Sequence, residues 1–144
     1  MQNNKIHELQ VYKMKGVFMM KIGPQVYVKG SFEAVERYCD AFGAKIGLNF
    51  ISPENTYEHC ELMINDQLFM AVSEAPDDCE RTKGQAWQTT AFNVYEMGSE
   101  EAVRHAFEIL SDGGTVIHPL GPCDWNTYCA DIVDKFGVFW WIAI

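Results

Sequence analysis

A direct repeat constrains the fold of this chain more than any other feature of its sequence. The segment 25–35 (QVYVKGSFEAV) returns at 93–103 (NVYEMGSEEAV), 68 positions later, with seven of the eleven residues identical. Each copy begins with β-branched and aromatic residues typical of a strand and continues into a helical pattern. Repeats of this kind indicate duplicated structural units. We therefore expect two similar strand–helix halves.

The passage from strand to helix has the same chemistry in both copies. A glycine permits a tight turn after the strand, and the serine that follows it (Ser31 or Ser99) is expected to cap the helix through its hydroxyl. Apolar residues then recur at helical spacing until Gly43 in the first copy and Gly113 in the second. The pattern predicts one amphipathic helix in each half.

Three strand-like stretches follow each helix. They cover about 45–51, 57–64 and 68–73 in the first half, and 115–120, 125–133 and 138–144 in the second. The pairs Asn65–Asp66 and Phe136–Gly137 are turn signals between the last two strands of each half. The sequence thus predicts an α+β domain, 21–144, made of two βαβββ modules at about 21–73 and 89–144. A polar linker, 74–88, joins them, and 1–20 form an N-terminal extension.

Charge and cysteine usage narrow the function classes. The net charge of −9 argues against nucleic acid or an acidic membrane surface as a partner, because both attract basic proteins. Five cysteines without a zinc-type spacing are expected to be free thiols in a reducing cytoplasm. No apolar run is long enough for a membrane span, and 1–20 lack the apolar core of a signal peptide. The extension is open to three readings: a true extension, a strand that pairs with a partner, or an early start with Met20 as the natural initiator.

Several short motifs resemble one branch of a known superfamily. They are YCDAFGA at 38–44, HCEL at 59–62, the stretch around Trp125, and DKFG at 134–137 followed by Trp140. With the repeat, they resemble the PhnB-like branch of the vicinal oxygen chelate superfamily, which includes glyoxalase I, bleomycin-resistance proteins, fosfomycin-resistance proteins and extradiol dioxygenases. The resemblance implies a cupped, mostly antiparallel sheet with helices on its outer face and a ligand cavity on the other. It also implies a homodimer.

The metal-binding positions of this superfamily carry unsuitable residues here. The resemblance places metal ligands on the first and last strands of each half, which correspond to Gly23, Ala91, Met70 and Trp141. A hard divalent ion needs histidine, aspartate or glutamate. We therefore predict no metal site and no cofactor.

Strand alternation predicts which side chains face the cavity. His59 and Glu61 share one face of their strand and form the candidate catalytic pair, because a carboxylate beside an imidazole can act as a general base or acid. Trp125, Thr127 and Asp131 are expected on the same cavity face. The candidate ligand-binding residues are Gln25, Tyr27, Met70, Asn93, Tyr95, Cys129 and Trp141.

Three functional hypotheses follow. The first is a PhnB-like protein of the glyoxalase and bleomycin-resistance type that binds a small apolar or aromatic molecule without metal. The second is a lyase, isomerase or dioxygenase-like enzyme that uses His59 and Glu61, with or without a divalent metal at an unconventional position. The third is a structural or regulatory dimer.

Overall fold

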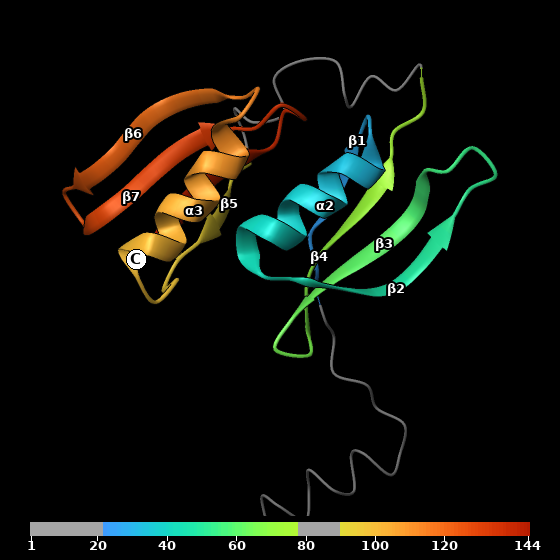
Figure 1. Cartoon of the computed structure of the whole chain (residues 1–144), viewed down its shortest axis with the longest axis horizontal. Helices are drawn as coiled ribbons and strands as arrows, with labels where there is room; N and C mark the ends of the chain where they lie inside the picture. Colours follow the sequence, from blue (N-terminus) through green and yellow to red (C-terminus); the bar gives the residue numbers. More distant parts are fainter. Residues whose placement is uncertain (1–21, 78–89) are drawn as a thin grey trace, which may run out of the picture.

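The computed structural model describes residues 22–77 and 90–144 (Figure 1). The first module contains β1 (Gln25–Val28), α2 (Ser31–Phe42), β2 (Lys45–Ile51), β3 (Tyr57–Ile64) and β4 (Gln67–Glu74). The second contains β5 (Phe92–Val94), α3 (Glu100–Ser111), β6 (Thr115–Cys123), β7 (Asn126–Val133) and β8 (Phe139–Ala143). The predicted extension, 1–20, and most of the predicted linker, 74–88, lie outside the described residues. The predicted α+β class and the two βαβββ modules are confirmed.

Both modules have the same sheet topology. The strand order is β1-β4-β3-β2 in the first sheet and β5-β8-β7-β6 in the second. In each sheet the edge strand β1 or β5 pairs in parallel with β4 or β8, and the other neighbours are antiparallel. Gln25 lies opposite Ala71 in one module, and its repeat partner Asn93 lies opposite Trp141 in the other. The duplicated segments therefore occupy equivalent places.

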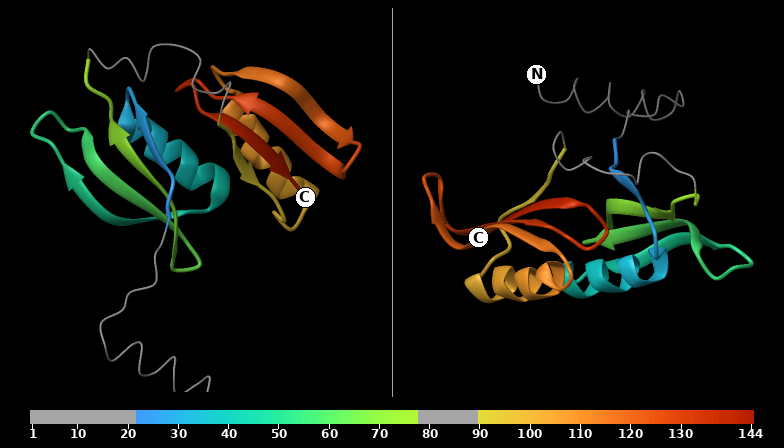
Figure 2. Two further views of the ribbon diagram at one scale, coloured as in Figure 1. Left: turned by 180° about the vertical axis from the view of Figure 1, so that it is seen from behind. Right: turned by 90° about the horizontal axis from the view of Figure 1, so that it is seen from above.

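The two helices cover the same side of the molecule. Seen from above, α2 and α3 form one layer and the two sheets form the other (right view in Figure 2). The helices also pack against each other. Their apolar faces contain Val35 and Tyr38 in α2 and Val103 and Leu110 in α3, all at most 2% exposed. The opposite face of each sheet carries no helix among the described residues, and we call it the open face.

The two helices begin in different ways, which corrects one prediction. Ser99 caps α3 as predicted, because its side chain accepts a hydrogen bond from the Ala102 amide. Ser31 does not cap α2: it is the first helical residue, and Gly30 at the cap position has a φ of 82°. The carboxylate of Glu74, from the end of β4, accepts the Gly30 and Ser31 amides at 3.1 and 2.7 Å. A long-range carboxylate therefore replaces the local hydroxyl.

Aromatic rings fill the seam between the modules. Trp140 of β8 is fully buried, and its ring centroid lies 5.1 Å from those of Tyr38 and Phe42 in α2. Phe42 also contacts Phe69 of β4 at 5.3 Å, and Phe92 of β5 contacts Trp140 at 5.4 Å. Because these rings come from both modules, the seam is a continuous part of the core.

No helix within residues 22–77 and 90–144 is long and apolar enough to cross a membrane.

Candidate functional site

The first open-face cavity surrounds the predicted catalytic pair. His59 and Glu61 project from β3 with Nε2 and Oε1 3.6 Å apart, and each side chain is 30% exposed. Gln25 lines the same cavity, which has a volume of about 800 Å³. Its side-chain amide donates a 2.8 Å hydrogen bond to Ser73. His59, Glu61 and Gln25 thus line one cavity on the open face of the first sheet.

The second open-face cavity lies in the second module, between β6, β7 and β8. Nδ1 of His118 lies 2.6 Å from Oδ2 of Asp131, across the antiparallel pair β6–β7. Trp125 and Trp141 line the same cavity, of about 510 Å³, together with Cys129. This cavity thus combines aromatic walls with a short imidazole–carboxylate contact.

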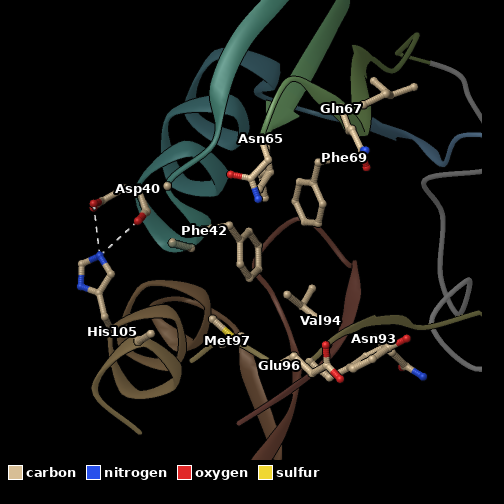
Figure 3. Close-up of a pocket in the computed structure, with 16 residues that line it drawn as sticks. Asp40, Phe42, Asn65, Gln67, Phe69, Asn93, Val94, Glu96, Met97 and His105 are labelled. Carbon is tan, nitrogen blue, oxygen red and sulfur yellow. Dashed lines mark hydrogen bonds and ion pairs between the residues drawn. The ribbon is translucent and has the colours of Figure 1, made fainter. Parts of the chain in front are cut away.

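A third cavity opens at the seam between the modules (Figure 3). Its volume is about 830 Å³, and Phe42, Phe69, Val94 and Met97 contribute apolar side chains to it. On its rim, Nε2 of His105 lies 3.3 Å from a carboxylate oxygen of Asp40. This cavity lies between the helix ends and strand ends rather than on the open face of one sheet.

The structure distributes the predicted ligand-binding residues over all three cavities. Gln25 belongs to the first, Cys129 and Trp141 to the second, and Asn93 and Tyr95 to the seam. Tyr27 is 40% exposed and lines none of these three. The prediction that all these residues line a single cavity is therefore wrong within one chain.

Met70 does not face the open side, and its predicted position was wrong. Met70 is 1% exposed and lies opposite Leu62, which belongs to the helix-covered core. The open-face position on β4 is Ala71, which pairs with both Gln25 and Glu61. Met70 and Trp141 lie equally far from the predicted turn residues Asp66 and Gly137, but β3 and β4 are joined by two residues, whereas β7 and β8 are joined by five. In a strand, an error of one residue reverses the face.

His118 is the residue that the sequence reasoning missed. Trp141 pairs with Asp131, and Ala71 pairs with Glu61, so Asp131 and Glu61 occupy equivalent places in the two sheets. Each of these carboxylates has a histidine within 3.6 Å, but from different positions: His59 on the same strand, His118 on the neighbouring one. The offset between equivalent positions grows from 68 at the first strands to 70 here. Only the cross-strand pairing shows that the His118–Asp131 pair is the counterpart of the His59–Glu61 pair.

The thiol of Cys129, which lines the second cavity, is a poor nucleophile. Burial raises the pKa of Cys129 to about 11, and the neighbouring Cys123 thiol adds to that rise. Since the thiolate is the reactive form, Cys129 is suited to packing rather than to attack on a ligand. Cys129 is 6% exposed, which fits this role.

The residues present do not fit a divalent metal. The parallel strand pairs place Gln25 beside Ala71 and Asn93 beside Trp141, so they offer amides and an indole instead of carboxylates or imidazoles. Within the described part of the chain, no three or more histidine, cysteine or acidic side chains are grouped as metal ligands require. The residues of these strand pairs therefore do not form a divalent-metal site.

Comparisons with known proteins identify the fold. No protein-family model matches the sequence, and no curated protein matches it. Among solved structures, the PhnB protein from Bacillus cereus, described as a putative 3-demethylubiquinone-9 3-methyltransferase, superposes with a TM-score of 0.73 at 21% identity, over 86% of this chain and 98% of that one. Protein PA1353 from Pseudomonas aeruginosa gives 0.70 at 21% identity, over 87% and 97%.

A third similar structure carries a metal. It is a variant of the fosfomycin resistance protein FosX from Listeria monocytogenes, complexed with Mn(II) and 1S,2S-dihydroxypropylphosphonic acid. It superposes with a TM-score of 0.55 at 14% identity, over 88% of this chain and 93% of that one. This chain therefore has the same two-module βαβββ fold as the PhnB protein, protein PA1353 and the FosX variant.

Proposed function

We propose that this chain is a PhnB-like protein of the glyoxalase and bleomycin-resistance type that binds a small apolar or aromatic molecule without a metal. One observation carries the proposal: the paired positions of β1 with β4 and of β5 with β8 hold Gln25, Ala71, Asn93 and Trp141 instead of metal ligands. Amides that orient a ligand and aromatic walls that cover it are the usual make-up of a small-molecule site.

The proposal includes a cytoplasmic homodimer. Phe50 pairs with His59 on the open face of the first sheet and is 54% exposed, and Trp125 beside the second sheet is 75% exposed. Large apolar side chains left in water on a sheet face favour coverage by another protein surface. A second copy of the chain supplies a surface of the same shape and composition, as the resemblance to this superfamily implies.

The test uses the full chain as purified. We expect elemental analysis to find well below one divalent ion per chain, and native mass spectrometry to find a dimer that carries or accepts a small aromatic compound. A thermal-shift screen of apolar and aromatic compounds should yield ligands that raise the melting temperature. Stoichiometric metal held by protein side chains would overturn the metal-free proposal.

A second candidate function is a lyase, isomerase or dioxygenase-like enzyme that uses His59 and Glu61. The contact of 3.6 Å between their side chains, within a cavity that also holds Gln25, favours it. For a compound that binds, the variants His59→Gln and Glu61→Gln would then remove turnover while the affinity changes little. A chain that dimerises but neither binds nor converts any compound would instead support the third hypothesis, a structural or regulatory dimer.

A further inference from the structure

We propose that the cavity of the second module binds a phenolic aromatic molecule, whose hydroxyl gives up its proton to Nε2 of His118. This inference rests on the proposed small-molecule function and assigns it a site and a ligand class. The observation that supports it is the short contact between His118 and Asp131 within a cavity lined by Trp125 and Trp141.

The geometry of the pair orients the imidazole. Nδ1 of His118 is held 2.6 Å from Oδ2 of Asp131, and Nε2 has no hydrogen-bond partner within the described residues. The side chain of Asp131 is only 23% exposed, whereas that of His118 is 73% exposed. The carboxylate is thus anchored against the sheet, and the imidazole presents Nε2 to an incoming molecule. With Nδ1 directed at the carboxylate, Nε2 is the ring nitrogen left to accept the proton of an incoming hydroxyl.

The walls of the cavity select the shape of the ligand. Trp141 extends from β8 on the same face as its strand partner Asp131, and Trp125 lies in the turn between β6 and β7. Pro119 and Pro122 of β6 add rigid apolar surface. A volume of about 510 Å³ suits a small aromatic molecule, and indole rings favour a planar partner.

The charges of the cavity select the ionisation state in which the ligand arrives. The titratable groups that line it with His118 are Asp124, Asp131, Cys123 and Cys129. Two carboxylates disfavour an anion, in keeping with the net charge of −9. A neutral phenol enters without this repulsion. From an acidic phenol such as a nitrophenol, the proton then moves from the hydroxyl oxygen to Nε2. The phenolate forms as an ion pair with the imidazolium, so the total charge beside the two carboxylates is unchanged.

The experiment uses 4-nitrophenol as the probe, because its phenolate absorbs visible light and the neutral phenol does not. We expect the full-length protein to bind the probe and to lower its apparent pKa by about one unit, the effect of a neighbouring cation. His118→Gln should abolish this shift, and Asp131→Asn should reduce it. Trp125→Ala should weaken binding about fivefold, the order of magnitude of one lost aromatic contact.

His105→Gln is the matched control, since His105 lies on α3 beside Asp40 and outside this cavity. It should change neither affinity nor shift. Circular dichroism should show that His118→Gln keeps the fold, because the side chain that it replaces is mostly exposed.

Two results would overturn the inference. The first is that wild-type protein does not bind the probe at millimolar concentration. The second is that the pKa of the bound probe is unchanged both in wild type and in His118→Gln. In both cases the proposed small-molecule function is still judged separately, by the compound screen and the co-purified compound, neither of which depends on His118.

Discussion

The hydroxyl of Tyr38 donates a 2.7 Å hydrogen bond to Oδ2 of Asp134, and it thereby joins residues 96 positions apart in the two modules. Trp140 donates from Nε1 to the same oxygen at 2.9 Å, and the amides of Phe136 and Val138 donate to Oδ1. Asp134 is 5% exposed, so nearly all its hydrogen-bonding capacity is met inside the protein. This buried carboxylate connects α2 of the first module to the last turn of the second.

Tyr38→Phe should lower the free energy of unfolding by about 1.5–3 kcal/mol, the range for a hydrogen bond to a charged group. The ring stays in place, so the loss reports the hydroxyl alone. Urea unfolding measures the effect. Tyr95→Phe is the control, since Tyr95 is 62% exposed, and it should change stability by less than about 0.5 kcal/mol. Equal losses in the two variants would contradict a structural role for the Tyr38–Asp134 bond.

Glu74→Gln should weaken the start of α2 and remove part of the acid sensitivity of the fold. Burial acts to raise the pKa of Glu74, but hydrogen bonds from Ser31 and Gly30, with nearby Lys29, outweigh it and hold the pKa below the usual 4.5. The folded state therefore binds this proton less tightly than the unfolded state. The stabilisation is present above the unfolded pKa and is lost as the pH falls through the folded pKa.

Urea midpoints measured from neutral to acidic pH test this effect. Wild-type protein should lose stability below about pH 4.5 more steeply than Glu74→Gln does. Glu58→Gln, at an exposed position of β3, should follow the wild-type curve. Parallel curves for wild type and Glu74→Gln would show that Glu74 does not supply the acid dependence.

Asp134 should contribute to the same curve with the opposite sign. Burial raises its pKa, and the hydrogen bonds from Trp140 and Tyr38 only partly offset this rise. The folded state thus binds the proton of Asp134 more tightly, and this contribution grows as the pH falls through the raised pKa. Tyr38→Phe removes one of the bonds that favour the charged form, so its destabilisation should shrink at acidic pH. Urea midpoints of this variant at neutral and acidic pH measure the change, and a constant difference from wild type would contradict it.

Phe50→Glu should dissociate the proposed homodimer, because it places a charge on the exposed open face of β2. Ile46→Glu is a matched control on the same strand: Ile46 is 48% exposed but pairs with Leu62, and therefore lies on the helix side. Analytical ultracentrifugation should find monomers for Phe50→Glu and dimers for Ile46→Glu. Dimers for both variants would place the interface elsewhere.

Cys60 and Cys129 should resist alkylation in the folded protein. Burial raises the pKa of each thiol to about 11, with smaller contributions from Cys39 to the first and Cys123 to the second. At pH 8, thiolate then amounts to about one part in a thousand. Mass spectrometry after brief iodoacetamide treatment should find both residues unmodified in native protein and modified in urea. Rapid labelling of Cys129 in native protein would contradict its raised pKa and make it a candidate nucleophile.

The duplication, the two helices and the faces of the first strands could be predicted from local patterns in the sequence. Val26 and Val28 are buried as their alternation predicts, and Gln25 and Asn93 take equivalent places 68 positions apart. These features depend on local patterns: strand alternation, helical spacing, and turn residues such as Asn65 and Asp66, which both have positive φ. Such patterns depend only on residues that are close together in the sequence.

Which distant residues come into contact depends on long-range pairing and packing. The exchange of Met70 for Ala71 on the open face follows from the unequal turns of the two modules, and the His118–Asp131 contact follows from the pairing of β6 with β7. Strand register is set by contacts across the sheet and by the core beneath it, and a shift of one residue reverses every side chain. For the same reason, strand alternation placed Gln25, His59 and Glu61 on the open face, but it misplaced Met70 and could not divide the other candidates among the cavities.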